Sequence, residues 1–230
     1  MPTVNPMSGI LGEAWRMYRA HLVHLLTIAF VVYVVATVVQ VLLTAALGWV
    51  GALIGAVVGL IAGFLVQAAL VRAVEDLRDG RADLSLGETF RAAQPALARV
   101  AVASILAAIA IAIGFVLLIA PGLYLLTIWA VIVPVLVIEG TGVGRSFDRS
   151  RELVRGYGWH VFATIVIVFL LGAVAGIVLD LLLSAVPDEA RRVASGLVSG
   201  TVFAPFSALV VTLGYYRLLD AHASAPQQQA

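Results

Sequence analysis

The chain has 230 residues, of which 62% are hydrophobic, and its mean hydropathy is +1.08, whereas soluble domains are only about 45–50% apolar. The formal net charge of +1 argues against a nucleic-acid partner. The absence of cysteine excludes disulfides, thiolate chemistry and cysteine-based metal sites. We therefore expect one integral membrane domain over residues 1–220, a disordered cytoplasmic tail at 221–230, no cofactor and no separate soluble catalytic domain.

Charged side chains gather in short clusters that bracket four long runs without Asp, Glu, Lys or Arg. The runs are residues 20–71, 100–138, 156–179 and 193–216. A bilayer span needs about 20 apolar residues, so the runs are long enough for two, two, one and one spans. The six expected transmembrane helices are 22–46, 49–71, 100–120, 122–139, 159–183 and 194–216. The first run is longer than a signal-peptide core, so it is expected to be a retained span.

Turn-forming residues mark three joints between these spans. Gly48-Trp49 is expected to turn the first hairpin and Pro121-Gly122 the second, because proline and glycine stop a helix. Pro187-Asp188-Glu189 is typical of a helix N-terminus, with proline and acidic residues in the first turn. Pro134 and Pro205 are expected to kink the fourth and sixth spans.

All 14 basic residues are arginines, a usage that fits a GC-rich genome. If there are six spans, 12 of them fall on one face, and only Arg191 and Arg192 fall on the other. Basic residues favour the cytoplasmic side of a membrane. We therefore expect a multi-pass protein of the bacterial cytoplasmic membrane with both termini in the cytoplasm.

Each cytoplasmic segment before a hairpin carries a similar motif that begins an amphipathic helix. The motifs are Gly12-Glu13-Ala14-Trp15-Arg16, Gly87-Glu88-Thr89-Phe90-Arg91 and Gly144-Arg145-Ser146-Phe147-Asp148. In the first segment Leu11, Trp15, Tyr18 and Leu22 recur at helical spacing. The second segment opens with a capping box from Ser85 to Glu88. The expected fold is an all-α integral membrane protein built from three repeats of an interfacial amphipathic helix and a helical hairpin.

One part of the chain carries a family resemblance. Its elements are Val137-Ile138-Glu139-Gly140, the run from Arg145 to Gly156, Trp159 with Phe162, the turn Ala120-Pro121-Gly122-Leu123 and the end Gly214-Tyr215-Tyr216-Arg217. Together they resemble the membrane domain attached to some bacterial glycerophosphoryl diester phosphodiesterases. In that family the phosphodiesterase chemistry resides in a separate soluble barrel domain. The resemblance therefore implies a helical membrane module, and this chain is not expected to be an enzyme.

Four glycines on the second expected span form three successive GxxxG steps along one helix face. They are Gly51, Gly55, Gly59 and Gly63. Without side chains they let a neighbouring helix approach closely, which is how spans associate in lipid. Packing within the chain is the expected use of this face, and an oligomer interface is the alternative. Gly172 with Gly176 and Gly196 with Gly200 are shorter versions of the same pattern.

The segment from Arg145 to Arg155 is the expected functional surface. Asp148 is expected to pair with Arg151, and Glu152 with Arg155, at i+3 spacing. The plain interpretation is a solvated helix in contact with lipid headgroups. The sharper hypothesis is a surface that binds an anionic lipid or a protein partner. It would consist of Arg145, Arg149 and Arg155 with Arg16 and Arg91 from the equivalent helices.

Other polar groups are better explained by ordinary structural roles than by a metal, catalytic or ion-transport site. Three histidines are expected near the cytoplasmic interface: His21, His24 and His160. A metal site would also need a carboxylate or a further histidine in defined geometry, so headgroup contact is favoured. Residues 76–80 match the opening of the CDP-alcohol phosphotransferase motif, but the rest of that motif is absent and a turn is expected. Asp180 and Glu139 lie near span ends, whereas ion-coupled carriers place such groups deep in the bilayer.

The leading functional hypothesis is a non-catalytic membrane module that packs with, or positions, a membrane or lipid-related partner. The rival is a transporter or flippase for a lipid-like substrate, moved between the repeated hairpins. An integral membrane enzyme is the third reading and lacks recognisable catalytic groups. A partner role predicts a stable complex on gentle extraction, and a carrier predicts a polar cavity that reaches mid-membrane.

Overall fold

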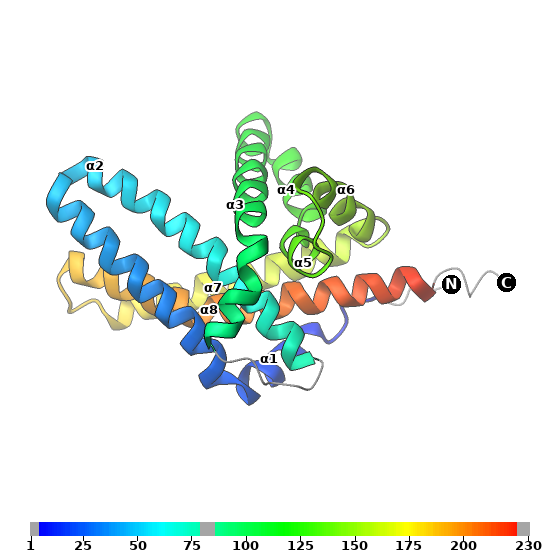
Figure 1. The fold of residues 1–230 in the computed structure, drawn as a ribbon, viewed down its shortest axis with the longest axis horizontal. Coiled ribbons are helices and arrows are strands. Elements are labelled where there is room, and N and C mark those ends of the chain that lie inside the picture. Colours follow the sequence, from blue (N-terminus) through cyan, green and yellow to red (C-terminus); the bar gives the residue numbers. More distant parts are fainter. Residues whose placement is uncertain (1–4, 79–85, 225–230) are drawn as a thin grey trace.

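The structure is a computed structural model that describes residues 5–78 and 86–224. These residues form eight helices and no strand (Figure 1), which confirms the expected all-α class. In chain order the helices are α1 (Ile10–Ala20), α2 (Leu22–Arg78), α3 (Leu86–Leu117), α4 (Ile119–Ile128), α5 (Ile132–Ile138), α6 (Val143–Val154), α7 (Gly158–Leu182) and α8 (Asp188–Ser224).

Helix α2 is bent into two antiparallel limbs at Gly48, where the first hairpin turn was expected (Figure 1). Gly48 has φ 59° and ψ −132°, a conformation that is open to glycine and strained for other residues. The limbs meet closely just beyond the bend. A Cβ added at Gly51 would lie 1.8 Å from the Leu43 carbonyl oxygen, and one at Gly55 would lie 2.8 Å from Gln40 Cγ.

The other two glycines of the GxxxG series differ from the expectation. A Cβ added at Gly59 or Gly63 would meet nothing within 4 Å. Farther along the same limb, Ala62 and Val66 are buried in the main core. The expected continuous glycine face is therefore a close contact over its first two positions only.

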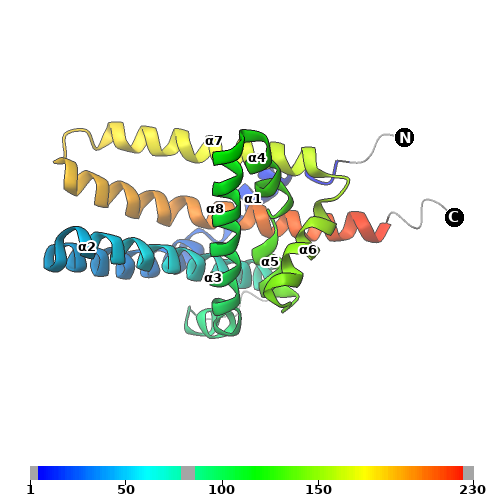
Figure 2. The same ribbon diagram turned by 90° about the horizontal axis from the view of Figure 1, so that it is seen from above.

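Five helical segments among the described residues are long and apolar enough to cross a membrane, and α2 counts once for both of its limbs. The two limbs of α2, α7 and α8 run in roughly the same direction in both views (Figures 1 and 2). The hairpin of α3 and α4 instead runs across them. The five candidate segments do not confirm the expected six spans, although the bend at Gly48 divides α2 into two apolar limbs.

Small residues explain how α3 crosses its neighbours closely. Ala93, Ala96, Val100 and Ala103 recur at helical spacing and are all at most 2% exposed. Helix α3 packs through its inner half on α2 and α5, and small side chains there allow the backbones to approach. Farther out, Gly114 lies against Gly122 of α4, where an added Cβ would come within 3.0 Å.

The main core lies at this crossing. Its largest fully buried members include Leu70 and Val74 on α2, Leu136 on α5, and Leu209 and Leu218 on α8. Many apolar side chains away from the crossing are exposed. Exposed apolar surface on long helices of this kind is suited to lipid contact.

Two joints differ from the sequence expectation. The α3–α4 turn falls at Leu118, whose backbone is extended, and Pro121 lies in the first turn of α4. Proline is tolerated there because that N–H has no partner in the helix. The fourth apolar segment breaks at residues 129–131, before Pro134. Helix α8 begins at Asp188, as expected, and it continues as one helix past Pro205.

The three amphipathic segments also differ from one another. The first and third are the separate helices α1 and α6, whereas the second is continuous with α3. Ser85 of the expected capping box lies outside the described residues. Helix α8 continues to Ser224, so residues 221–224 are helical, and the rest of the expected tail lies outside the described residues.

Helix α1 buries a different stripe from the one expected. Its buried residues are Ile10, Ala14 and Tyr18, while Trp15 is 49% exposed. The reason is that α1 packs on α8. The Tyr18 hydroxyl donates a hydrogen bond to the carbonyl oxygen of Val202 at 2.9 Å.

Substitution of the hairpin glycines tests this packing. Gly51→Ala should lower the free energy of unfolding by about 1–3 kcal/mol, because the new methyl group collides with the Leu43 carbonyl. The matched control Gly59→Ala should be neutral or stabilising, since alanine is the better helix former and has open space there. Thermal unfolding in detergent measures both. Equal stability of the two variants would contradict the hairpin contact.

Candidate functional site

The short segment that follows α5 is held by arginines from two other helices. Arg72 of α2 donates through Nη2 to the carbonyl oxygen of Val137. Arg99 of α3 donates through Nη1 to the carbonyl oxygens of Gly140 and Thr141, the latter at 3.0 Å. The last carbonyls of a helix have no partner within it and carry partial negative charge. Arg72 satisfies one such carbonyl of α5, and Arg99 binds the two carbonyls of the loop that follows, so the end of α5 is tied to α2 and α3.

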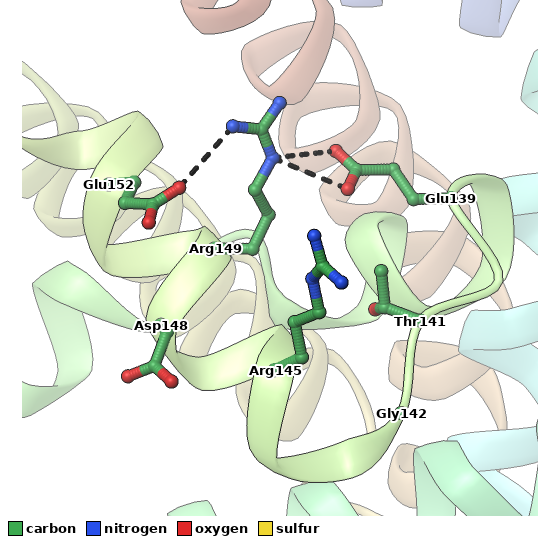
Figure 3. Close-up of a pocket in the computed structure, with 7 residues that line it drawn as sticks. All are labelled: Glu139, Thr141, Gly142, Arg145, Asp148, Arg149 and Glu152. Atoms are coloured by element: carbon green, nitrogen blue, oxygen red, sulfur yellow. Dashed lines mark hydrogen bonds and ion pairs between the residues drawn. The ribbon is translucent and has the colours of Figure 1, made fainter.

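Glu139, the first residue after α5, joins three elements. Arg149 of α6 donates through Nε to the two carboxylate oxygens of Glu139, at 3.1 and 3.3 Å (Figure 3). The hydroxyl of Tyr215 on α8 donates to Oε1 at 3.0 Å, and Tyr215 is only 2% exposed. The carboxylate is therefore a structural junction among α5, α6 and α8.

Arg149 is fully used by this junction. Burial alone would lower the pKa of its guanidinium, but the hydrogen bonds and negative charges of Glu139 and Glu152 outweigh burial and raise that pKa. Its Nη1 also lies 3.4 Å from Glu152 Oε2. Arg149 was expected on a surface that binds anions, and the structure places it in internal ion pairs instead.

The expected i+3 pairs along α6 are also different. Glu152 pairs with Arg149, not with Arg155, and within residues 5–78 and 86–224 neither Asp148 nor Arg151 forms an ion pair. The cause is the position of Glu139 beyond the helix. Arg149 reaches Glu139 with Nε, which leaves its Nη1 directed at Glu152 on the next turn (Figure 3).

Three arginines in and directly after α6 remain available to an external group. Among the described residues, the side chains of Arg145, Arg151 and Arg155 make no hydrogen bond or ion pair, and all three are exposed. The opposite face of α6 is buried and contains Ser146, Ser150, Leu153 and Val154. Helix α6 thus has a packed face and a cationic face.

The five-arginine surface expected from the repeats is not one surface. Helix α1, which carries Arg16, packs on α2 and α8, whereas α6 packs on α3, α4, α5 and α8. Figure 1 shows α1 below and α6 above the C-terminal part of α8. Arg91 lies near the start of α3, a third location. Of the expected set, Arg145 on α6 and Arg155, the residue directly after α6, have no side-chain partner among the described residues and lie on the same segment.

A cavity of about 590 Å³ lies on one side of α6. It is lined by Glu139, Thr141, Gly142, Arg145, Asp148, Arg149 and Glu152. In Figure 3 the Arg145 side chain extends toward Arg149 and Thr141, while Asp148 points away. Three carboxylates and two guanidinium groups give the lining a formal charge of −1, so this cavity does not favour an anion.

A second cavity, of about 690 Å³, lies on another side of α6 against α4 and the start of α7. It is lined by Tyr124, Ile128, Asp148, Arg151, Glu152, Val154, Arg155, Gly156 and Gly158. Sequence reasoning identified the α6 arginines but missed Tyr124 and Ile128. Those two residues lie within an apolar run, where no local signal distinguishes them from lipid-facing neighbours.

Residues 5–78 and 86–224 contain no cluster of three or more His, Asp or Glu side chains that could hold a metal ion. Comparisons with protein-family models, with curated proteins and with solved structures find no match to this chain. The geometry around α6 is therefore the main indication of function.

A double-mutant cycle tests the junction at Glu139. We expect the Arg149–Glu139 pair to show a coupling energy of about 1 kcal/mol and the more exposed Arg149–Glu152 pair only about 0.3 kcal/mol. The variants are Arg149→Gln, Glu139→Gln and Glu152→Gln, singly and in pairs. Unfolding by denaturing detergent gives the free energies. A larger coupling for Glu152 would contradict the junction.

Proposed function

We propose that this protein is a non-catalytic membrane module whose α6 helix presents a cationic face to anionic lipid headgroups. In this role it positions a membrane or lipid-related partner at the bilayer. The observation that carries the proposal is the division of the arginines. Arg72, Arg99 and Arg149 are bound to protein groups, whereas Arg145, Arg151 and Arg155 have no protein partner among the described residues.

The surroundings of α6 support a location at the membrane surface. Helix α6 leads directly into α7, which is long and apolar enough to span a bilayer. Trp159, in the first turn of α7, is 76% exposed, and tryptophan is enriched at membrane interfaces. An amphipathic helix at this level buries its apolar stripe and keeps its charges in water.

The family resemblance remains a proposal that points the same way. The segment in which it is most specific, residues 120–162, includes most of α4, all of α5, the Glu139 junction, α6 and the start of α7. The alternative is a carrier of a lipid-like substrate, for which a polar cavity among the spans would be needed. The two cavities described above both border α6 instead, so the module reading has the better support.

We propose that the protein lies in a bacterial cytoplasmic membrane, with α6 and both ends of the described chain on the cytoplasmic side. Arg217 near the end of α8 donates to the carbonyl oxygens of Pro6 and Ser8, so the two ends lie together. At the other end of α8, Arg191 pairs with Asp180 and Asp188. The asymmetric distribution of arginine supports this orientation.

Single introduced cysteines test the orientation, because the natural chain has none. Ala223→Cys should react with a membrane-impermeant maleimide only after the cytoplasmic side is opened. Ala190→Cys should react in intact cells. Both positions are exposed in the structure. The unmodified chain is the control for background labelling. Labelling of Ala223→Cys from outside would reverse the proposed orientation.

Stepwise removal of charge tests the proposed headgroup surface. Each basic residue near an anionic surface contributes about 1 kcal/mol, and salt weakens the effect. Replacing Arg145, Arg151 and Arg155 by Gln, one at a time and together, should therefore reduce the anionic lipid retained on the purified protein in graded steps. Native mass spectrometry measures the retention.

Arg191→Gln serves as the matched control, because Arg191 is ion-paired at the other end of α8. It should leave lipid retention unchanged. If the triple Gln variant holds as much anionic lipid as the parent protein, the headgroup surface is wrong and these arginines serve topology alone.

A further inference from the structure

The second cavity has two chemically different walls. Tyr124 and Ile128 come from α4, a short helix within an apolar segment, and Tyr124 is 54% exposed. Arg151 comes from the last turn of α6, and Arg155 directly follows that helix. Gly156 and Gly158 close the cavity at the start of α7 without adding side chains. The site therefore offers an apolar side and a cationic side to the same occupant.

Direct contacts between α4 and α6 hold these walls in position. The Ser150 hydroxyl donates to the Ile128 carbonyl oxygen at 2.9 Å, and Ser150 is fully buried. Next to this bond, the rings of Trp129 and Phe147 meet edge to face at 4.8 Å. A cavity whose walls are fixed before binding loses little entropy when it is occupied.

The free charges around this cavity add up to +1. Arg151 and Arg155 supply two cations without protein partners, and Asp148 supplies one carboxylate. The Glu152 carboxylate is already paired with Arg149. A phosphodiester carries one negative charge, and the planar fork of a guanidinium group matches its oxygens. By the same count, the free charges of the first cavity are Arg145 and Asp148 and add up to 0, so that cavity lacks this match.

We propose that the second cavity binds one phospholipid molecule. Its phosphodiester lies between Arg151 and Arg155, and the upper part of an acyl chain lies against Tyr124 and Ile128. The volume of about 690 Å³ is within the range of about 300–1,000 Å³ of small-molecule sites. The headgroup region fits inside, and the rest of the chain leaves along the exposed side of α4. This inference rests on the proposed function and adds a fixed site and stoichiometry to it.

Native mass spectrometry with added ligands tests the site. The probes are phosphatidylglycerol, diacylglycerol with the same chains, and glycerol 3-phosphate. The parent protein should retain one phosphatidylglycerol tightly and bind the other two at least about tenfold more weakly, because each lacks one half of the interaction. Equal binding of glycerol 3-phosphate would overturn the phospholipid proposal in favour of a free-anion site, and equal binding of diacylglycerol would overturn the role of the arginines.

Variants distinguish this single-lipid site from a diffuse surface, on which Arg145, Arg151 and Arg155 each attract headgroups independently. The double variant R151Q/R155Q should lose the tight lipid by about tenfold or more in affinity. Tyr124→Gln should weaken lipid binding without removing a charge, and because Tyr124 is already half exposed, the variant should fold. The matched control R191Q, at the other end of α8 and outside this cavity, should keep the tight lipid, and R145Q should lower only the lipid that is retained beyond this one molecule.

Failure of the single-lipid site can be distinguished from failure of the proposed headgroup surface. If R145Q reduces retention as much as a single change at Arg151, and Tyr124→Gln has no effect, the diffuse surface stands and the single-lipid site is wrong. If none of the arginine changes alters lipid retention, both proposals fail.

Discussion

Arginine side chains that donate to backbone carbonyls hold one end of this molecule together, and the other contacts there depend on them. Arg72 and Arg99 bind the carbonyls at and beyond the end of α5, and Arg217 binds those of Pro6 and Ser8. A guanidinium group has five N–H donors in a rigid plane, so it can serve several carbonyls at once. With α5 fixed in this way, Glu139 is presented to Arg149 and Tyr215, and α6 is positioned with its cationic face outward.

The second constraint is close backbone packing between helices. The bend at Gly48 and the contact at Gly51 bring the limbs of α2 together, and the alanines of α3 let it cross α2 and α5. Small residues are used in this way where the surrounding solvent is lipid, because packing rather than hydrophobic burial then drives association. The arginines thus stabilise the polar end of the fold, and the small residues allow its apolar helices to pack closely.

Local features of the fold could be predicted from the sequence, and features set by distant partners could not. The turn at Gly48 and the start of α8 at Asp188 follow from residue type alone. The direction of the α3–α4 hairpin depends on which helix its alanines meet. Arg149 pairs with Glu139, which lies ten residues earlier and across a loop. Spacing within a single helix therefore predicted the wrong ion pairs. In the candidate site, α6 was recognisable by its charges, whereas the apolar wall from α4 became visible only when the two helices were placed together.

The docking of α1 on α8 has a consequence for biosynthesis. Tyr18 bonds to Val202, and Glu13 pairs with Arg217, so these partners of α1 lie 184 and 204 residues later in the sequence. The ribosome therefore makes α1 long before it makes the part of α8 that α1 contacts. Throughout that interval Ile10 and Ala14, which are buried in the finished fold, cannot yet be covered by α8. The docking of α1 is thus a late step in the folding of these eight helices.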